Sequence, residues 1–148
     1  MIKRPIKTNH TTIVAVKDGY VRFSEVDSLR MVWHGNYIRY FEDGREAFGM
    51  QYGMGYLDVH EHGYVTPIVK AECDYKRPLR YGDKIRIETR FINSNAAKLI
   101  FDYTIYNLST NQVAATGQTI QVFLDGEGEL QLTNPPFFEE WKQKMGLE

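Results

Sequence analysis

The sequence predicts an α+β fold, in which one long helix lies against one face of an antiparallel sheet. Apolar residues recur at helical spacing only once before residue 50, and four strand-like segments then follow one another between residues 64 and 124. Short turns rich in Asn, Ser and Gly separate those segments. A single helix followed by an antiparallel meander favours this class. Because no repeat, linker or low-complexity segment interrupts the chain, we expect one domain over residues 1–148.

The first predicted element is a strand over residues 11–23, which are rich in β-branched and aromatic side chains. Asp18-Gly19 interrupts it, but the flanks are short for a hairpin, so we expect one long strand with a bend or bulge at Gly19. Residues 1–10 are polar and are expected to be frayed. Residues 24–35 have no clean period and are expected to form an ordered loop.

The predicted helix begins at Asn36, whose side chain is a good N-cap. Its apolar face is formed by Tyr37, Phe41, Gly44 and Phe48, which lie three or four residues apart. Gly44 costs about 1 kcal/mol relative to Ala inside a helix. We therefore expect the helix to approach another element, most simply the sheet, at this glycine. Glycines between residues 49 and 55 end the pattern.

Four strands are predicted in the second half of the chain, at residues 64–75, 85–91, 98–106 and 113–124. The second and third alternate apolar and polar residues, which is typical of strands with one solvated face. Pro67 indicates an edge or a bulge in the first. After two prolines, the segment FFEEWKQKM predicts a short C-terminal helix.

Composition excludes several classes of function. The net charge is −1, which gives no electrostatic basis for binding nucleic acid or anionic membranes. No run approaches the ~18 apolar residues of a membrane helix, and the basic N-terminal residues are not followed by an apolar stretch, so no secretory signal is predicted. Cys73 is the only cysteine, has no metal-ligand spacing and is expected to be a small buried hydrophobe. We expect a cytoplasmic protein without nucleic-acid or membrane partners.

A specific pattern lies at residues 21–45. The segment VRFSEVD is followed seven residues after Asp27 by His34, and then by NYIRYFEDGR. This pattern resembles the hotdog-fold acyl-CoA thioesterases, in particular the 4-hydroxybenzoyl-CoA thioesterase and YbgC-like branch. The segments CDYKRPLRYGDKIRIETR and AATGQTIQVFLD are also similar, so that the resemblance covers about residues 10–130.

The resemblance implies a long central helix wrapped by a curved five-stranded antiparallel sheet. It also implies a homo-oligomer, in which two chains join their sheets edge to edge and often pair again as a dimer of dimers, a homotetramer. Active sites in this family lie at the subunit interface and take parts from both chains.

Asp27 is the predicted catalytic residue. Thioester hydrolysis needs an activated water or an attacking carboxylate, and donors for the oxygen that becomes negative. The start of a helix offers such donors, because its first N–H groups are unpaired. From the residues alone a loop aspartate is a turn or cap residue; the resemblance makes Asp27 the general base or nucleophile. It also implies two roles for His34: a backbone N–H that polarises the thioester carbonyl, and an imidazole that assists proton transfer or holds the thioester. The alternative is an ordinary loop histidine.

The resemblance places the CoA portion of the substrate at Ser94, Asn95 and Lys98, although an ordinary hairpin turn is the alternative there. Asn36, Tyr37 and Arg30 are further candidates for contact with the substrate, and Tyr37 fits the core equally well. No metal is expected, because His60-Glu61-His62 lacks helical metal-ligand spacing. CoA is part of the substrate, so no cofactor is expected either.

Two positions depart from the family pattern, and both bear on which substrate is used. Phe23 replaces a tyrosine four residues before Asp27, and Arg30 replaces a glycine three residues after it. The leading hypothesis is an acyl-CoA thioesterase that releases a carboxylic acid and CoA. The alternatives are an acyl-carrier-protein thioesterase and a non-catalytic thioester-binding hotdog subunit; a hotdog dehydratase or hydratase has no matching motif here.

Overall fold

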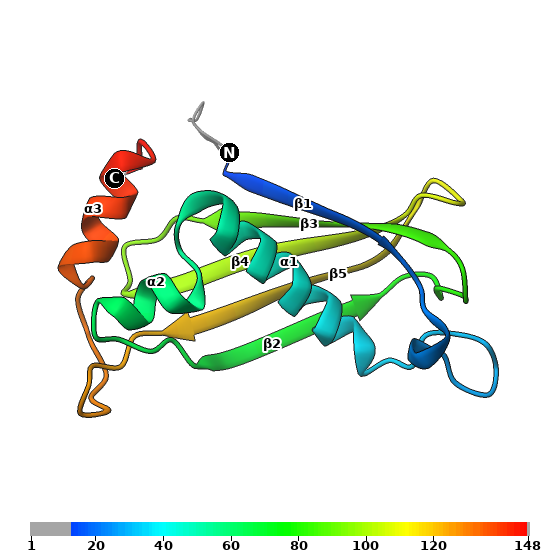
Figure 1. Cartoon of the computed structure of the whole chain (residues 1–148), viewed down its shortest axis with the longest axis horizontal. Coiled ribbons are helices and arrows are strands. Elements are labelled where there is room, and N and C mark those ends of the chain that lie inside the picture. The colour runs from blue at the N-terminus through cyan, green and yellow to red at the C-terminus, as the bar shows by residue number, and fades with distance from the viewer. Residues whose placement is uncertain (1–12, 148) are drawn as a thin grey trace, which may run out of the picture.

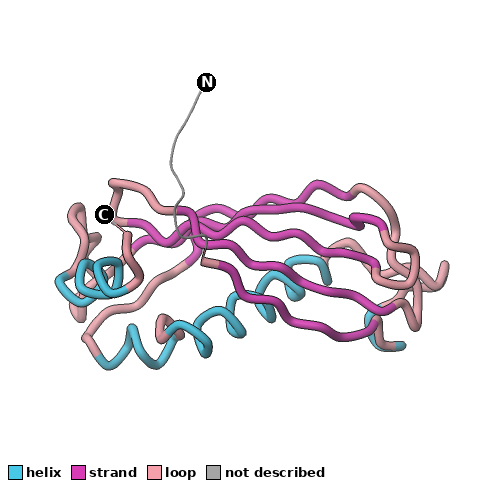
Figure 2. Tube along the Cα trace, turned by 90° about the horizontal axis from the view of Figure 1, so that it is seen from above, coloured by secondary structure: helices cyan, strands magenta, loops and turns pink. Residues whose placement is uncertain are grey.

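The computed structural model describes residues 13–147, which form a five-stranded antiparallel sheet with a long helix across one face (Figures 1 and 2). The helices are α1 (Asn36–Tyr52), α2 (Tyr56–Glu61) and α3 (Pro136–Lys144). The strands are β1 (Val14–Tyr20), β2 (Ile68–Tyr75), β3 (Lys84–Ile92), β4 (Lys98–Asn107) and β5 (Gln112–Val122). The predicted α+β architecture is confirmed. The expected tail, residues 1–10, and the expected strand start at Thr11 lie outside the described residues.

The strands are ordered β1-β3-β4-β5-β2, so that β1 and β2 form the two edges of the sheet. Each pair of neighbours is antiparallel. Pro67 was expected to mark an edge or a bulge, and the edge is confirmed because β2 is an edge strand. The register of β2 also shifts between Ile68 and Lys70, directly after Pro67. The strand itself begins at Ile68 and not at residue 64.

Helix α1 packs its predicted apolar stripe onto the concave face of the sheet. Phe41 stacks on Tyr103 with ring centroids 4.5 Å apart, and Phe48 meets Phe101 edge to face at 4.9 Å. A Cβ on Gly44 would lie 2.7 Å from Ile87 Cγ2, so the helix backbone approaches β3 more closely than any side chain would allow. The predicted close approach at Gly44 is confirmed.

The prediction for the first strand is wrong in two respects. Strand β1 pairs with β3 without a register shift through Gly19, so no bulge forms there. The strand also ends at Tyr20, and Phe23–Glu25 form a short 3-10 helix, η2. The chain turns because the Val21 N–H donates to Asp83 O (2.9 Å) and the Arg22 N–H donates to Glu25 Oε1 (2.8 Å).

Helix boundaries near the glycines also differ from the prediction. Gly49 lies within α1, and Gly53, the residue that follows the helix, has a left-handed φ of 77°. The six-residue helix α2 follows and was not predicted; the Gly55 N–H donates to Asp58 Oδ2 at its start. No helix within residues 13–147 has the length and apolarity needed to span a membrane.

The predicted C-terminal helix is confirmed as α3, which packs at the end of the sheet where β3 turns into β4 (Figure 1). The indole N–H of Trp141 donates to Tyr52 O (2.7 Å), at the end of α1. The Lys142 ammonium donates to Ser94 O (2.8 Å), in the turn between β3 and β4. These bonds fix α3 to two elements that are distant in sequence.

Candidate active site

Asp27 lies in a small hairpin that connects η2 to α1. Val26 and Val32 form an antiparallel bridge, and the Asp27 N–H donates to Met31 O (2.8 Å). The Val32 N–H donates to Leu79 O (2.8 Å), which ties the hairpin to the segment that leads into β3. The hairpin therefore lies at the end of the sheet where α1 begins.

The carboxylate of Asp27 is used only in part by the turn. Its Oδ1 accepts from the Leu29 N–H (2.8 Å) and, more weakly, from the Met31 N–H (3.4 Å). Its Oδ2 has no hydrogen-bond partner among residues 13–147, and the residue is exposed. One carboxylate oxygen of Asp27 thus stabilises the turn, while the other is available to a ligand or to water.

Arg30 occupies a backbone position that favours glycine. Its φ is 67°, in the left-handed region. A non-glycine residue there costs roughly 1–2 kcal/mol. The arginine thus adopts the conformation for which the family's glycine is suited, and the hairpin carries backbone strain next to Asp27.

The start of α1 has no side-chain cap. The N-cap residue is Gly35, and no side chain accepts from the first N–H groups of the helix. In the part of the chain that the structure describes, the N–H groups of His34 and Gly35 donate to no acceptor. The positive end of the helix therefore presents free donors at the surface.

The prediction of Asn36 as the N-cap is wrong. Asn36 is the first helical residue, and its buried Nδ2 donates to Glu25 O (2.9 Å). The side chain acts as a donor to η2 and not as an acceptor for the helix. This bond, together with that from the Trp33 N–H to Glu25 O (3.1 Å), holds the helix start against the Asp27 hairpin.

The imidazole of His34 is exposed and lies against the Trp33 ring, with centroids 4.9 Å apart. Its backbone carbonyl accepts from the Tyr75 hydroxyl (3.0 Å) at the end of β2. Tyr75 was not a predicted site residue, although it lies within the segment CDYKRPLRYGDKIRIETR that carries part of the resemblance. The contact joins residues that are 41 positions apart, so only the fold brings them together.

Tyr37 is buried beneath the helix start. Its hydroxyl accepts from the Leu79 N–H (3.3 Å), and its ring meets the Tyr75 ring edge to face at 4.9 Å. Burial raises the pKa of this phenol. The side chain supports the helix start from inside, and its contact with a substrate stays a prediction.

The residues predicted to bind CoA lie at the other end of the sheet. Ser94, Asn95 and Lys98 belong to the turn between β3 and β4 and to the start of β4. Strand β3 has nine residues, which span about 30 Å, and it separates this turn from the Asp27 hairpin. Ser94 Oγ accepts from the Ala96 N–H (2.9 Å), as in an ordinary turn. Within one chain, the structure does not bring the two groups of predicted residues together.

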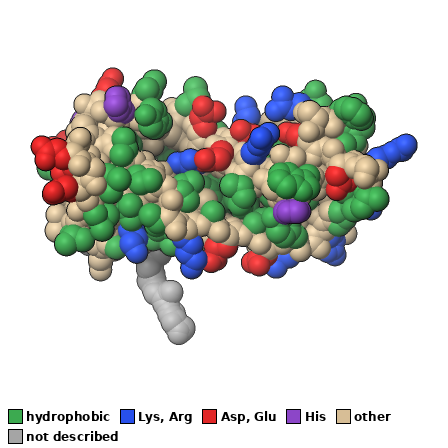
Figure 3. Space-filling model, turned by 90° about the horizontal axis from the view of Figure 1, so that it is seen from below, with side chains coloured by type: hydrophobic (Ala, Val, Ile, Leu, Met, Phe, Trp, Pro, Cys, Tyr) green, Lys and Arg blue, Asp and Glu red, His purple; other side chains and the backbone are tan. Residues whose placement is uncertain are grey.

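A groove of about 1380 Å³ runs between α1 and α2 on one side and β4, β5 and residues 65–68 at the start of β2 on the other. Its rim includes the exposed side chains of Met50, Tyr56 and Leu57. Figure 3 shows that hydrophobic side chains are spread along this side of the molecule, between charged ones. The groove is large enough for an acyl group, and its lining combines apolar residues with charged side chains of α1 and α2.

A smaller hollow of about 260 Å³ lies between α1 and β1. The Tyr40 hydroxyl donates there to Glu25 Oε1 (2.9 Å), and burial raises the pKa of Tyr40. Burial, with Glu25 and Glu46 nearby, also raises the pKa of the Asp43 carboxyl. Since Glu25 also anchors Arg22 and Asn36, this cluster holds the base of the hairpin.

Comparison with known proteins defines the class. The model of the thioesterase-like superfamily matches residues 21–142, so the chain belongs to this superfamily. Over 128 residues the chain is 29% identical to the provisionally named acyl-CoA thioesterase YneP of Bacillus subtilis. The aligned segment covers 86% of this chain and 92% of YneP. It is 26% identical over 135 residues to 1,4-dihydroxy-2-naphthoyl-CoA hydrolase of Prochlorococcus marinus, with 86% and 87% of the two chains covered.

Solved structures support the same fold. The DHNA-CoA thioesterase from Staphylococcus aureus superposes with a TM-score of 0.79 at 22% identity, over 90% of this chain and 91% of that one. The predictions of a hotdog fold and of a thioester hydrolase are thus confirmed at the level of the superfamily. Membership of the 4-hydroxybenzoyl-CoA and YbgC-like branch stays a prediction.

Proposed function

We propose that this protein hydrolyses acyl-CoA thioesters to a carboxylic acid and CoA, as a member of the 4-hydroxybenzoyl-CoA and YbgC-like branch. One observation carries the proposal. A hairpin and a helix start, held together by Glu25, present a free carboxylate oxygen on Asp27 and unpaired N–H groups on His34 and Gly35. These are the two kinds of group that thioester hydrolysis requires.

In this proposal, the thioester carbonyl oxygen accepts hydrogen bonds from the His34 and Gly35 N–H groups, which makes the carbonyl carbon electrophilic. Asp27 then acts through Oδ2 in one of two ways. It takes a proton from a water that attacks the carbonyl carbon, or it attacks that carbon itself to give an anhydride that water opens. Either route breaks the carbon–sulfur bond, and the CoA thiolate leaves and is protonated. Water is the only co-substrate.

Other predicted residues have supporting roles in the proposal. The exposed imidazole of His34 lies next to the donor N–H groups and assists proton transfer or holds the thioester. The Arg30 side chain is exposed on the same hairpin and supplies a positive charge near the substrate. We place the reaction in the cytoplasm, where a free thiol such as that of Cys73 is maintained.

The active unit in this proposal is a dimer joined along β2, or a dimer of such dimers. Strand β2 is an edge of the sheet, and its Val69 and Tyr75 side chains are exposed. A two-fold axis through the middle of β2 sets the Tyr75 end of one chain beside the Ile68 end of the other. The helix start of each chain then faces the mouth of its partner's groove, and the opposite ends of the two sheets meet. This arrangement lets Ser94, Asn95 and Lys98 serve a site of the other chain.

A second candidate is hydrolysis of an acyl-carrier-protein thioester by the same groups. The chain is 29% identical over 107 residues to the chloroplastic acyl-acyl carrier protein thioesterase ATL3 of Arabidopsis thaliana, and it covers 56% of that protein. The chemistry at the carbonyl is the same, so only the carrier distinguishes the two candidates.

The test is release of free thiol from a panel of acyl-CoA and acyl-carrier-protein thioesters. Wild type is expected to release thiol, and Asp27→Ala to lose at least about 100-fold in rate. Asp27→Asn is the matched variant: it keeps the Oδ1 acceptor of the turn and is expected to be as slow while folding normally.

Each other outcome has a definite meaning. Equal rates for wild type and both variants would remove Asp27 from the mechanism. Release from the carrier protein alone would favour the second candidate, and no release from any thioester would leave a non-catalytic binding subunit.

A further inference from the structure

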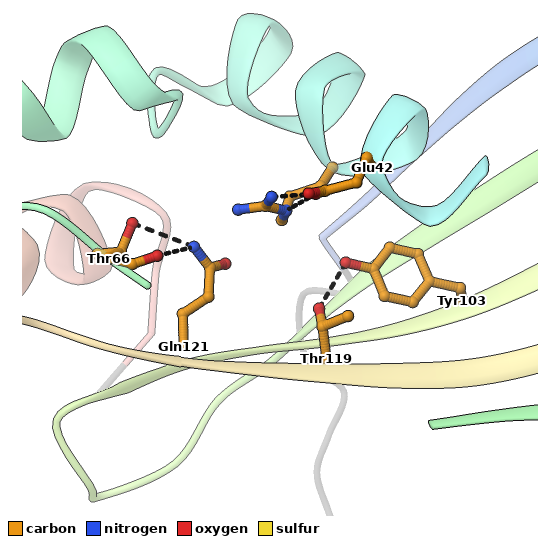
Figure 4. Close-up of polar contacts among 6 residues, drawn as sticks. Glu42, Thr66, Tyr103, Thr119 and Gln121 are labelled. Carbon is orange, nitrogen blue, oxygen red and sulfur yellow. Dashed lines mark hydrogen bonds and ion pairs between the residues drawn. The ribbon is translucent and has the colours of Figure 1, made fainter. Parts of the chain in front are cut away.

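Gln121 on β5 is a polar side chain buried in the lining of the groove between α1, α2 and the sheet. Only 1% of the residue is exposed. Its Nε2 donates to Thr66 O (2.7 Å) and contacts Thr66 Oγ1 at 3.1 Å (Figure 4). Because a backbone carbonyl can only accept, the amide atom that faces it must be the nitrogen. The orientation of the amide is therefore fixed by its surroundings.

The amide oxygen of Gln121 is left without a partner. Oε1 is buried and accepts no hydrogen bond from any of residues 13–147. In Figure 4 it lies on the side of the amide that is turned away from Thr66. An unpaired buried acceptor is unfavourable and is rare in folded proteins. In a groove large enough for an acyl group, it is the feature expected of a site whose ligand supplies the donor.

The neighbouring polar groups are already paired with one another. The Arg45 guanidinium, on the helix side of the groove, is held by Glu42. The Tyr103 hydroxyl bonds to Thr119 Oγ1 (2.6 Å), two residues before Gln121 on the same strand (Figure 4). Apolar groove residues such as Leu99, Phe101 and Leu124 offer no donor. Acidic side chains of α1 and α2, such as those of Asp43 and Glu46, also line the groove. Among the buried side-chain polar atoms of residues 13–147 that lack a partner, Gln121 Oε1 is the one that belongs to a residue of the groove lining.

We infer that Gln121 is a specificity-determining residue, whose Oε1 accepts a hydrogen bond from a hydroxyl or N–H group on the acyl part of the substrate. The substrate class is then a mainly apolar acyl thioester that carries a hydrogen-bond donor away from its carbonyl. This inference rests on the proposed function, because the thioester site is what directs the acyl group into the groove. Residues 65–68 line the groove, and the proposed dimer sets them beside the helix start of the other chain.

Discrimination by such an acceptor follows from its burial. A hydrogen-bond donor on the substrate pairs with Oε1. An acyl group that lacks a donor leaves this oxygen buried and unpaired in the complex as well. Sites built to bind a hydroxyl reject the analogue that lacks it more strongly than apolar pockets reject an extra methylene group. We expect a preference of about 10-fold or more in kcat/KM for the hydroxylated member of a matched pair.

The test measures kcat/KM for matched pairs of acyl-CoAs. The pairs are 4-hydroxybenzoyl-CoA with benzoyl-CoA, 1,4-dihydroxy-2-naphthoyl-CoA with 2-naphthoyl-CoA, and ω-hydroxydecanoyl-CoA with decanoyl-CoA. Wild type is expected to prefer the hydroxylated member of at least one pair, and Gln121→Met to abolish that preference. Thr119→Val is the matched control, because Thr119 is buried on the same face of the same strand but is already paired with Tyr103. It is expected to keep the preference.

Several results would overturn the inference. If wild type hydrolyses both members of every pair equally well, Gln121 does not select the substrate, although the proposed function stands. A preference that survives in Gln121→Met has the same meaning. If no member of any pair is hydrolysed, the proposed function fails. The role of Gln121 is then tested by binding: dissociation constants are measured for the same pairs of acyl-CoAs with the Asp27→Asn variant. Equal constants for the two members of every pair would overturn the inference about Gln121. The wild-type ratios test the role of Gln121 even if Gln121→Met does not fold.

Discussion

The two ends of the sheet differ in whether their tryptophan side chains are buried and their polar groups are paired. At the end covered by α3, Trp141 is 7% exposed and its indole N–H is bonded, and the Lys142 ammonium is bonded to Ser94 O. At the end where α1 begins, Trp33 is 52% exposed, and the N–H groups of His34 and Gly35 have no acceptor among residues 13–147. Native proteins pair their buried polar groups within the fold, whereas N–H groups at the start of a helix are left to water or to a ligand. The comparison supports the proposal that the α3 end provides stability and the α1 end provides the thioester site.

The largest expected effect is on stability at the α3 end. Trp141→Ala is expected to lower the free energy of unfolding by about 3–5 kcal/mol, because the ring packs against Phe91 (5.1 Å) and Phe138 (6.0 Å). Trp33→Ala, the matched variant at the α1 end, is expected to cost less than about 1 kcal/mol. Urea denaturation measures both. Equal losses of unfolding free energy in the two variants would show that the α3 end is not more important for stability than the α1 end.

A smaller effect tests the strain in the Asp27 hairpin. Arg30→Gly is expected to raise the free energy of unfolding by about 1 kcal/mol, because glycine adopts a φ of 67° without strain. Asn111, with a φ of 58°, is the control. Asparagine tolerates the left-handed region, so Asn111→Gly should gain less. If Arg30→Gly raises the free energy of unfolding by no more than Asn111→Gly does, the backbone at Arg30 is not strained.

The smallest effect concerns the pH dependence of stability at the α3 end. Burial lowers the pKa of Lys142 in the folded protein. Between this lowered value and the unfolded value of ~10.4, the unfolded chain holds more protons than the folded one. The free energy of unfolding therefore rises with pH in this window, and the gain is lost as pH falls through the folded pKa. Denaturation of wild type and Lys142→Met across the window should show their difference increasing with pH. A difference that decreases with pH would contradict the assignment.

Much of the fold was predictable, because it follows from strong periodic patterns. The alternation over residues 85–91 corresponds to β3, Lys84–Ile92, and the stripe through Phe41 and Phe48 corresponds to the buried face of α1. Failures occurred where a tertiary contact overrides a local preference. Residues 21–23 have strand-like side chains, but bonds to Asp83 and Glu25 turn the chain into η2.

The candidate site was predictable only as far as its motif extends. The spacing from Asp27 to His34 indicated a loop before the helix start. The structure shows that this loop contains a hairpin, which Glu25 holds against the helix start. The Tyr75 contact and the unpaired oxygen of Gln121 depend on strand order and on side-chain orientation, for which the sequence carries no local signal. Ser94 lies in the predicted turn after β3, and its distance from Asp27 follows from the direction of that strand.

The most direct test is the vibrational frequency of the bound thioester carbonyl. An acyl-CoA with an isotopically labelled carbonyl is bound to the Asp27→Asn variant, and difference Raman spectra separate its stretching band from those of the protein. If the His34 and Gly35 N–H groups polarise the carbonyl, the band lies at lower frequency than for the same acyl-CoA in solution. A band at the solution frequency would contradict the claim that the start of α1 is the thioester site.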